Sequence, residues 1–587
     1  MTTAGRPAQT VIVLGGGIGG MSAAHELVER GFAVRVFERR RLAGGKARSV
    51  DVHGTGTDGR RDLPGEHGFR FFPRFYRHVT DTMARIPVGG GRTAFDNLVE
   101  ASRDEIARAG RVPIVMPAWF PRHARDIELL LHDEREIATL GLSPEDLQAF
   151  SVRIWQLMSS CHDRASQEYE RTSWFAYLGA ESHSEAFRQI LARGLTRTLV
   201  AATPKEASAE VGGTVLTELV YATGRPGRSD DRLLNGPTND VWLTPWLTYL
   251  RSRGVDYRLD TEVTAIHMHA GRIAGVTVKG PAGEERISGD YYVSALPVER
   301  MNPLLTEQMV HADPTLHGIR TLAADVAWMT GIQFYMSERI PIIQGHVTYI
   351  DTAWALTSIS QAQFWSGYDL STFGDGTVRD ILSVDISDWN APGTLTTTKC
   401  ADECTRDEIE AEVWAQLKAS LNVDGHEVLR DGHKRSWYLD RDISVTTGGD
   451  HDAEPLLVNK AGRWVMRPAA HTAIPNFFLA SDYVRTNTNL ATMEAANEAA
   501  RRAVNGIIDA SGVDAPYCRI WPLYQPWMLA PLRWHDARRY AQGLAWDPRP
   551  PLVIRILHTI ATFLGSIGHR SRPSSPAPRS QPPASAG

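Results

Sequence analysis

The sequence is poor in cysteine and has neither a strong charge excess nor a long apolar run. Its 587 residues include four cysteines, none in a CxxC pair, so neither a disulfide scaffold nor a zinc site is expected. A net charge of -5 with a pI near 6.5 excludes attraction of nucleic acid over the whole surface. No apolar run reaches the roughly 20 residues that span a bilayer.

The first residues also lack the basic and apolar blocks of a signal peptide. MTTAGRPAQT passes directly into VIVLG, so export by that route is not expected. A reducing cytoplasm fits the few cysteines, and no metal site is predicted. The length predicts two or more interleaved domains.

A βαβ unit is predicted at the start of the chain. The apolar run Val11 to Leu14 precedes six residues, 15 to 20, of which five are glycine, and a helical pattern then ends at Gly31. A second strand, Ala33 to Phe37, ends at Glu38. Strand, glycine turn, helix and acidic residue occur in the order of a dinucleotide-binding fingerprint.

Each part of this unit has a physical reason. Gly15 permits the tight turn, Gly17 lets the backbone approach a pyrophosphate, and Gly20 lets helix and strand pack closely. The helix N-terminus offers free N–H groups and the positive end of its dipole. Glu38 can accept hydrogen bonds from both ribose hydroxyls, so adenosine without a 2′-phosphate is preferred.

The segment after Glu38 distinguishes FAD from NAD. Arg39 leads through a second glycine pair to Lys46, and this pattern resembles the E-x(5)-G-G-[RK] of the flavoprotein family of amine oxidases and phytoene desaturases. In that family the pair lies against the second phosphate and the flavin side, which implies FAD here. Lys46 stands where arginine is commoner and would neutralise phosphate as a point charge.

Three further stretches resemble the same family. Residues 65 to 72, GEHGFRFF, are similar to the G-x-H segment beside the flavin in the desaturase branch. Residues 235 to 278 resemble the stretch in which the backbone of a valine, here Val263, meets the adenine. Residues 289 to 297, GDYYVSALP, resemble the strand that closes the FAD domain.

The last resemblance covers residues 474 to 503, with FFLASDY followed by ATMEAANEAARRA. It implies that Asp482 hydrogen-bonds the ribityl or pyrophosphate part of FAD. A helix starting near Asn489 would direct its N-terminus at the flavin and stabilise negative charge on the reduced ring. Ser481 and Ala495 both replace family glycines, so the local geometry departs from the pattern.

Together these resemblances imply an α/β fold, with a Rossmann-like, p-hydroxybenzoate-hydroxylase-like FAD domain interleaved with an α+β substrate domain. The FAD domain is expected from residues 1–85, 231–300 and 455–510, and the substrate domain from 86–230 and 301–454. The predicted cofactor-binding residues are Gly15, Gly17, Ile18, Gly19, Gly20, Glu38, Arg39, Gly45, Lys46, Gly68, Phe69, Arg70, Val263, Asp482 and Met493.

The expected substrate domain is rich in aromatic side chains, which either build its core or line a pocket for a lipophilic substrate. These are Trp155, Trp174, Phe175, Trp328, Phe334, Trp354, Trp365 and Trp389. Family amine oxidases usually place a lysine near flavin N5. None of Lys205, Lys399 and Lys460 aligns with that position. The Asp482-Tyr483 pair favours the desaturase branch.

No catalytic side chain can be assigned from the sequence. His67 and Arg70 are expected near the flavin ring, where each either takes part in the chemistry or binds backbone and FAD oxygens. Structural hydrogen bonding is the expected role of three polar residues in apolar surroundings, namely Asp385, Asp388 and His471.

A C-terminal extension, residues 511–569, follows the expected FAD domain. It contains an amphipathic helix, 551–568, that either lies in a bilayer interface or docks on the protein body. The tail, 570–587, has three arginines and no acidic residue, and its Ser/Pro/Ala composition predicts disorder. The expected location is cytoplasmic, with peripheral association at the inner face of the membrane left open.

The resemblance implies an FAD-dependent oxidoreductase that dehydrogenates a lipophilic isoprenoid-type substrate, a carotenoid or terpenoid, by hydride transfer to flavin. Two alternatives remain: a flavin-containing amine oxidase, and a carotenoid isomerase that uses flavin without net oxidation. The sequence does not name the exact substrate, the electron acceptor or the oligomeric state.

Overall fold

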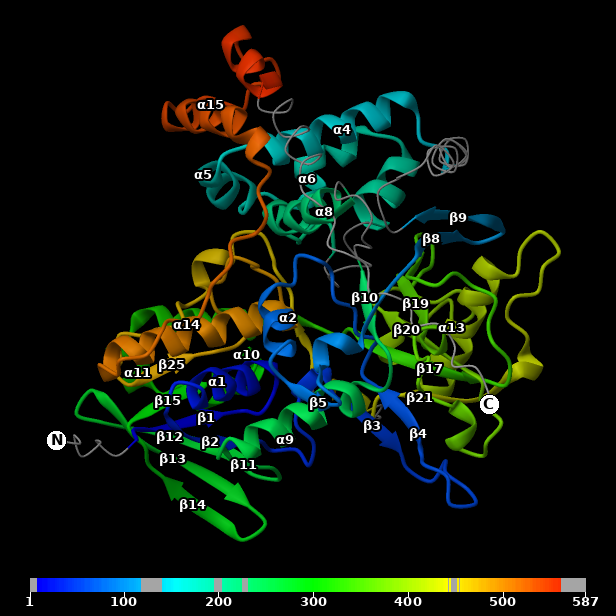
Figure 1. Ribbon diagram of the computed structural model, residues 1–587. Coiled ribbons are helices and arrows are strands. Elements are labelled where there is room, and N and C mark those ends of the chain that lie inside the picture. Colours follow the sequence, from blue (N-terminus) through cyan, green and yellow to red (C-terminus); the bar gives the residue numbers. More distant parts are fainter. Residues whose placement is uncertain are drawn as a thin grey trace, which may run out of the picture. The chain divides into compact units, whose positions relative to one another are not determined.

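The computed structural model describes residues 8–117, 140–194, 203–223, 231–441, 443–444, 451–452 and 454–560 (Figure 1). Two compact units are present. Unit 1 comprises Met1–Phe150 and Tyr169–Tyr524, and unit 2 comprises Ser151–Glu168 and Gln525–Gly587. Unit 1 is a mixed α/β structure that contains a parallel sheet.

The parallel sheet of unit 1 draws its strands from four separate parts of the chain. It has five strands in the order β11-β2-β1-β15-β25, and every neighbouring pair is parallel. Residues Val11 to Leu14 of the central strand β1 are fully buried and α1 packs against this strand, as the continuous apolar sequence requires. The bounds are β11 (Asp256–Arg258), β2 (Ala33–Phe37), β1 (Thr10–Leu14), β15 (Tyr291–Ser294), β25 (Phe477–Leu479), α1 (Ile18–Val28) and α14 (Met493–Ser511).

The register of this sheet brings the segments that follow its five strands to one edge. Val13 pairs with Val36 on one side and with Val293 on the other, and Ser294 pairs with Leu479. Because all five strands run in the same direction, the residues that follow each strand meet at the carboxyl edge. Ligands of open α/β sheets bind at that edge.

A second sheet of seven strands forms the other core of unit 1. Its order is β21-β17-β20-β19-β18-β8-β9, antiparallel except for the β18–β8 pair. Apolar side chains of α13 (Arg406–Leu421) pack on one face. The strand bounds are β21 (Lys434–Leu439), β17 (Thr330–Met336), β20 (Asp380–Ile386), β19 (Leu356–Ser360), β18 (Val347–Tyr349), β8 (Arg103–Arg108) and β9 (Arg111–Pro117).

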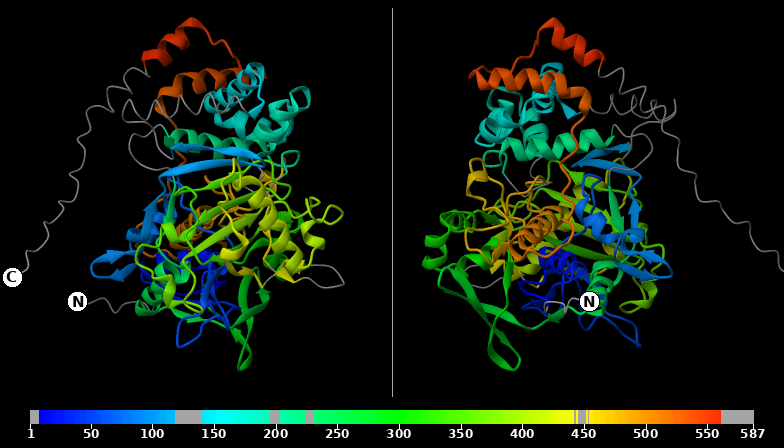
Figure 2. Two further views of the ribbon diagram at one scale, coloured as in Figure 1. Left: turned by 90° about the vertical axis from the view of Figure 1, so that its right-hand side faces the viewer. Right: turned by 60° about the vertical axis from the view of Figure 1, so that its left-hand side comes forward.

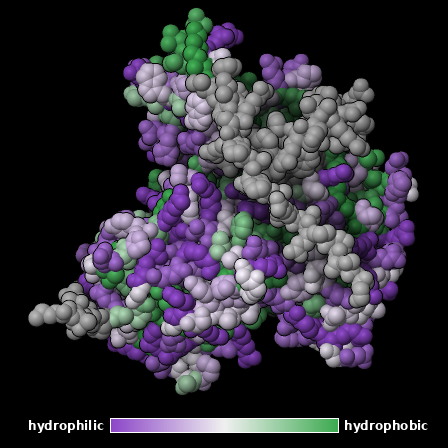
Figure 3. Space-filling view, in the orientation of Figure 1, coloured by the Kyte–Doolittle hydropathy of each residue, from purple (hydrophilic) through white to green (hydrophobic). Residues whose placement is uncertain are grey.

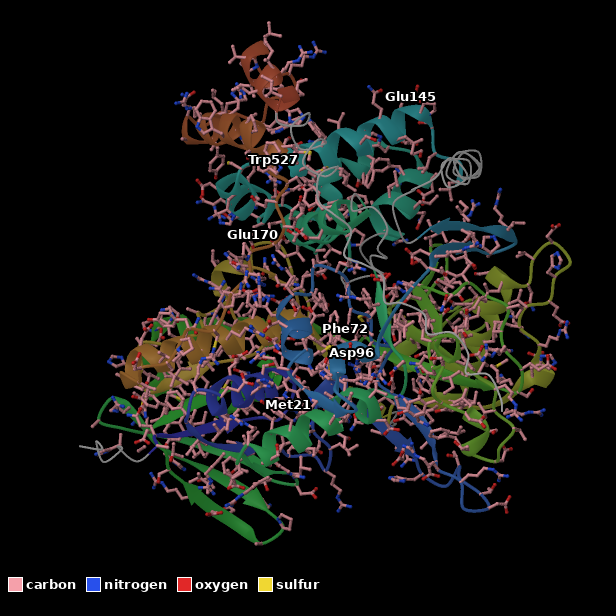
Figure 4. The ribbon with its side chains drawn as sticks, viewed as in Figure 1. Met21, Phe72, Asp96, Glu145, Glu170 and Trp527 are labelled. Carbon is pink, nitrogen blue, oxygen red and sulfur yellow. The ribbon has the colours of Figure 1, made fainter. Side chains whose placement is uncertain are left out.

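Smaller elements complete unit 1. A three-stranded antiparallel sheet, β12-β13-β14, extends from its body (Figure 2). Met21 lies on α1 (Figure 4). The Phe72 ring lies edge-on to the Trp242 ring, with 5.4 Å between the ring centroids. The bounds are β12 (Glu262–His269), β13 (Arg272–Gly280), β14 (Gly283–Ile287), β3 (Ser49–Val52), β4 (Leu63–Glu66), α2 (His78–Met83), α6 (Trp174–Leu178), α8 (Ala209–Thr223) and α9 (Thr244–Ser252).

Unit 2 is held together by a buried ion pair. Asp536 on α15 (Ala530–Ala541) accepts hydrogen bonds from the Arg164 guanidinium at 3.0 Å and from the Cys161 N–H at 2.8 Å. Arg164 and Asp536 are 2% and 3% exposed. The unit also contains the end of α4 (Pro144–Ser159), α5 (His162–Arg164) and a helix over 552–560.

The expected helix over 551–568 is helical as far as it is described, to residue 560. Its remainder and the predicted tail, 570–587, lie outside the described residues. Within those residues, no helix combines the length and hydropathy needed to cross a membrane.

Candidate functional site

The glycine turn after β1 forms the floor of the site. Gly15 has a φ of +97°, which favours glycine, and its N–H donates to the Phe37 carbonyl at 2.9 Å. A Cβ on Gly19 would fall 2.0 Å from the Ala480 carbonyl oxygen, so only glycine lets α1 approach the end of β25. Gly20 lies in α1 against the Gly15 carbonyl oxygen.

Glu38 follows the last residue of β2 and hydrogen-bonds the same glycine turn. Its carboxylate accepts hydrogen bonds from the Gly16 N–H at 2.8 Å and from the Arg40 N–H at 2.9 Å. Burial raises the pKa of Glu38, although these two N–H groups oppose that effect. Each carboxylate oxygen has a second lone pair, so Glu38 can still accept from a ribose hydroxyl.

The second glycine pair lies directly over the first turn. The Gly44 N–H donates to the Gly16 carbonyl at 2.8 Å. Lys46 forms an ion pair with Glu299 at 3.0 Å, and its ammonium also donates to the Pro455 carbonyl. This loop therefore brings one flexible cation to the carboxyl edge of the parallel sheet.

A buried carboxylate, Glu454, ties the arginines of this loop to a distant part of the chain. It pairs with Arg48 at 2.7 Å and with Arg40 at 2.6 Å. Burial alone would raise the pKa of Glu454, but the two guanidinium groups outweigh burial and hold it at about 2. Glu454 is therefore ionised throughout the neutral pH range.

The far wall of the site comes from β25 and α14. The Ala480 N–H donates to the Ser294 carbonyl at 2.8 Å, which extends the strand pairing, and Ser481 and Asp482 follow. The helix begins at Met493, with Thr492 as its N-cap, so the expected start near Asn489 is wrong. Asn489 instead takes a φ of +48°, in the left-handed region, which ends any continuous helix through that segment.

One cavity of about 810 Å³ joins these parts. Of the predicted cofactor residues, all but Gly20 line it, because Gly20 packs inside α1. Of the two departures from the family pattern, Ser481 lines the cavity, whereas Ala495 is fully buried in α14 outside its walls. The lining residues are Gly15, Gly17, Ile18, Gly19, Glu38, Arg39, Gly45, Lys46, Gly68, Phe69, Arg70, Val263, Asp482 and Met493.

Arg70 joins the glycine loop to the next part of the wall. Its guanidinium donates to the Gly68 carbonyl at 2.8 Å, to the Ala47 carbonyl at 3.3 Å and to the Lys46 carbonyl. These contacts satisfy backbone oxygens, one of the two roles expected for Arg70. Arg70 thus positions the loop on which Lys46 stands.

His67 and Asp385 stand side by side in the cavity wall. His67 Nδ1 lies 2.8 Å from Asp440 Oδ2, and Nε2 has no hydrogen-bond partner. Asp385 on β20 accepts a hydrogen bond from the Phe69 N–H, but its oxygen Oδ1 has no partner, so the expected structural hydrogen bonding accounts for only part of this carboxyl group. Burial raises the pKa of Asp385 to about 7, although Arg70 and His67 oppose it.

The rest of the cavity wall is mainly apolar and aromatic. The His346 ring meets Phe69 edge-on at 5.2 Å and lies 5.8 Å from Phe71. Burial lowers the pKa of His346 to about 4, so its imidazole is neutral at pH 7. Further apolar residues of this wall include Phe75, Tyr76, Ile106, Val215, Met329, Ile350 and Leu490.

None of the eight aromatic residues named from the sequence lines this cavity. Trp174, Phe334 and Trp354 are fully buried in the core, which supports the core interpretation for them. Apart from Phe37, the phenylalanine and tyrosine residues that line the cavity come instead from residues 69 to 76, directly after the G-x-H segment. Their proximity to that motif is the signal that could have found them.

Sequence reasoning also missed Asp440 and Glu454. Both lie far along the chain from their partners His67 and Arg48, and neither belongs to a recognisable motif. Only the folded chain brings these carboxylates to the site.

The family model for flavin-containing amine oxidoreductases matches residues 18–508. The chain belongs to this family. The matched residues extend from α1 to α14, the two helices that bound the cavity. Membership makes the chain an FAD-dependent oxidoreductase. No protein of curated function has a detectable sequence match to it.

Solved structures share this fold at low sequence identity. Cyclohexylamine oxidase from Brevibacterium oxydans is 14% identical, with a TM-score of 0.57, over 87% of this chain and 100% of that one. Putrescine oxidase bound to putrescine is 13% identical, with a TM-score of 0.56, over 86% and 99%. A putative protoporphyrinogen oxidase from Exiguobacterium is 14% identical, with a TM-score of 0.53, over 86% and 100%.

The residues present fit FAD. The cavity is continuous from the β1 turn and Glu38, at the adenosine end, to Met493 and the first turn of α14. Gly19 is sterically obligatory, and Lys46 supplies a cation for a phosphate. Among the described residues, no cluster of His, Cys, Asp and Glu is arranged to hold a metal ion.

Proposed function

We propose that this oxidoreductase dehydrogenates a lipophilic, isoprenoid-type substrate such as a carotenoid or terpenoid. Bound FAD supplies the hydride acceptor for such a reaction. The chain holds FAD through the residues from Gly15 to Lys46, and the apolar wall from Phe69 onward would hold the substrate and exclude water. The electron acceptor that reoxidises the flavin stays open.

The observation that carries this proposal is where the lysines lie. All seven lysines fall within the described residues, and Lys46 alone lines the cavity. Lys399 pairs with Glu408 at 2.6 Å, and Lys460 pairs with Asp325 at 3.4 Å. Lys205 lies over the Phe175 ring at 5.3 Å. Apart from Lys46, which belongs to the glycine loop, no lysine therefore lines the cavity to take the place near flavin N5 that is usual in family amine oxidases.

The cavity wall supports the same proposal. Its substrate part combines the rings of Phe69, Phe71 and Phe75 with aliphatic side chains, and His346 there is neutral. Such a surface gains about 25 cal/mol for each Å² of apolar area it buries, which favours a hydrocarbon chain.

Oxidation of an amine is the second candidate, and two carboxylates favour it. Asp104 and Asp231 both line the cavity. Burial raises the pKa of Asp231 to about 6, so it is mostly ionised at pH 7 and could attract an ammonium group. The family description and two of the structural neighbours, both named as amine oxidases, point the same way.

Anaerobic reduction of the bound flavin tests both candidates. The purified holoenzyme is mixed in separate detergent samples with phytoene, with squalene-type alcohols, and with primary and secondary amines. We expect bleaching of the flavin absorbance near the visible maximum with an isoprenoid and none with the amines.

Bleaching by amines alone would replace the proposed function with amine oxidation. Turnover of a carotenoid without any consumption of an acceptor would instead indicate an isomerase, the remaining alternative. Absence of bleaching with every isoprenoid would contradict the proposal.

A further inference from the structure

Asp385 occupies a space in the cavity wall that two glycines keep open. A Cβ on Gly68 would fall 2.6 Å from Asp385 Oδ1, and a Cβ on Gly331 would fall 2.9 Å from it. Gly331 stands opposite Asp385 on the neighbouring strand β17, and its N–H donates to the His67 carbonyl. Glycine at these two positions therefore leaves the space that the Asp385 carboxyl group occupies in the cavity wall.

The charges around Asp385 leave its carboxyl able to change protonation state. Arg70 and His67 face it from the segment after β4 and favour the ionised form, as does the Phe69 N–H. Glu66 on β4 opposes ionisation. Burial exceeds the sum of these effects, and the resulting pKa of about 7 is close to the value at which a general base works best near neutral pH.

Two other buried carboxylates, Glu66 and Asp380, differ from Asp385 because both of their oxygens accept hydrogen bonds. Glu66 accepts from the Thr238 hydroxyl at 2.7 Å and from Gln361 at 3.1 Å. Asp380, at the other end of β20, accepts from Ser360 at 2.9 Å and from the Ile340 N–H at 2.9 Å. Glu66 and Asp380 therefore have structural partners that Asp385 Oδ1 lacks.

We propose that Asp385 accepts the proton that the substrate loses during dehydrogenation. This proposal rests on the proposed function. In the reaction one C–H bond breaks with its electron pair, which leaves as hydride to the flavin. The adjacent C–H bond breaks as its proton passes to the Asp385 carboxylate, and the electrons left behind form the new double bond. With an amine, the hydride would leave from carbon and the proton from nitrogen.

The test combines Asp385→Asn with two comparison variants. His67→Gln removes the imidazole that faces Asp385, and Asp388→Asn removes a buried carboxylate from the same segment outside the cavity. Flavin content and the flavin absorbance spectrum show whether each variant folds and loads FAD. The rate of anaerobic flavin reduction is then measured from pH 5 to 9.

The expected results separate Asp385 from its neighbours. In the wild-type enzyme the rate rises with pH through about 7, because the base must be ionised. Asp385→Asn lowers the rate by about 100-fold or more and abolishes that rise. Asp388→Asn keeps both the rate and the pH profile. His67→Gln keeps the rise.

A second measurement does not depend on the substrate. The carboxyl C=O absorption of the holoenzyme is titrated by infrared difference spectroscopy, and Asp385→Asn identifies the band. A band that titrates near pH 7 supports the proposal, and one that titrates near pH 4 overturns it. Full activity of Asp385→Asn on an isoprenoid would overturn the proposal while leaving the proposed function intact. Loss of the pH-dependent rise in His67→Gln would transfer the role to His67.

A separate feature, in unit 2, carries a second inference. The helix over 552–560 exposes a continuous apolar stripe and buries only Ile554 among its apolar residues. The spacing of the exposed residues places them on one helical face (Figure 3). They are Leu552, Val553, Ile556, Leu557 and Ile560, between 46% and 67% exposed.

Exposed tryptophans and arginines accompany this stripe. Trp527 (Figure 4) and Trp534 are each 51% exposed, and the Arg538 guanidinium lies 4.0 Å from the Trp534 ring centroid. Residues 525–560 contain five arginines, no lysine and two acidic residues, of which Asp536 is paired with Arg164. The positive charge of unit 2 contrasts with the chain's net charge of -5.

We propose that this face of unit 2 binds the surface of an anionic lipid bilayer. Apolar side chains would enter the boundary between headgroups and acyl chains, tryptophan would sit at the headgroup level, and arginine would attract anionic headgroups.

Vesicle sedimentation tests this proposal. The full chain is mixed with phosphatidylglycerol vesicles and with phosphatidylcholine vesicles, and Ile556→Glu is compared with Leu395→Glu, which changes an exposed apolar residue of unit 1. We expect binding to phosphatidylglycerol that weakens with salt, a loss of at least 10-fold in Ile556→Glu, and no loss in Leu395→Glu. Equal binding by both variants would overturn the proposal, as would a concentration-dependent dimer that Ile556→Glu abolishes.

Discussion

At the scale of single residues, Gly19 determines whether α1, near the start of the chain, can pack against the end of β25, which lies far along the chain. A Cβ at this position would overlap the Ala480 carbonyl oxygen, a backbone atom that cannot rotate away. We expect Gly19→Ala to lower the free energy of unfolding by about 2 kcal/mol and to weaken FAD binding at least 10-fold. Isothermal titration of the apoprotein with FAD measures the latter.

A matched control exists elsewhere in unit 1. Gly432 has open space around its Cα and a φ outside the left-handed region, so Gly432→Ala should leave both quantities unchanged. Unchanged FAD affinity in Gly19→Ala would show that α1 can shift away from β25.

The sequence was most informative where backbone geometry restricts residue choice. Fourteen of the fifteen predicted cofactor residues line one cavity, because glycine turns and the strand end at Glu38 have strict local requirements. Asp385 and Asp440 had no such signal, since their roles depend on which side chains fold against them. The sequence alone does not show whether the oxygens of a carboxylate have hydrogen-bond partners in the folded protein.

At the scale of elements, Glu494 in the first turn of α14 holds α2 in place. Its carboxylate accepts from the N–H groups of Arg77, His78 and Val79 at 2.7 to 2.9 Å, and from the His78 ring. This gives a structural reason for the glutamate in the family's M-E pattern. Removing it leaves buried donors unpaired and a helix N-terminus without its anion.

Glu494→Ala should therefore lower the free energy of unfolding by about 3 kcal/mol, measured by urea denaturation. Glu284→Ala, at an exposed site on β14, serves as the comparison and should change it by less than about 0.5 kcal/mol. A loss below about 1 kcal/mol in Glu494→Ala would mean that water replaces the carboxylate.

The glycine loop should also respond to acid through Glu454. The pKa of Glu454 is lowered to about 2 by Arg48 and Arg40, from an ordinary value of 4.5. Its contribution is therefore present above about pH 4.5 and is lost as pH falls toward 2, on the order of 3 kcal/mol in full. We expect Glu454→Gln to remove part of the pH dependence of unfolding in this window, measured by denaturant midpoints between pH 3 and 6. An unchanged dependence would contradict the ion-pair assignment.

At the scale of the whole molecule, two compact units predict two unfolding events. Asp536→Ala leaves the Arg164 guanidinium buried without its partner in unit 2, at a cost of about 3 to 5 kcal/mol. We expect calorimetry to show one transition moving down by several degrees while the FAD-stabilised transition stays in place. A joint shift of both transitions would show that the units unfold as one.

Asp547→Ala provides the control for this prediction. Asp547 also belongs to unit 2, but its ion pairs with His535 and Arg539 are long, at 3.4 and 3.9 Å, and partly exposed. Its removal should shift neither transition measurably. The sequence predicted a C-terminal extension but gave no sign that residues 151–168 belong to the same unit, because the pairing of Arg164 with Asp536 exists only in the folded chain.

The order of strands in the parallel sheet has a consequence for biosynthesis. β1 needs β15 as a neighbour and the cavity needs α14, yet these segments emerge from the ribosome about 280 and 480 residues after β1. At a translation rate of roughly 5 to 20 residues per second, α14 is synthesised roughly 25 to 100 s after the β1–turn–α1 unit. We therefore expect the FAD site to be complete only after α14 has been synthesised, and until β15 is available one edge of β1 has no strand partner.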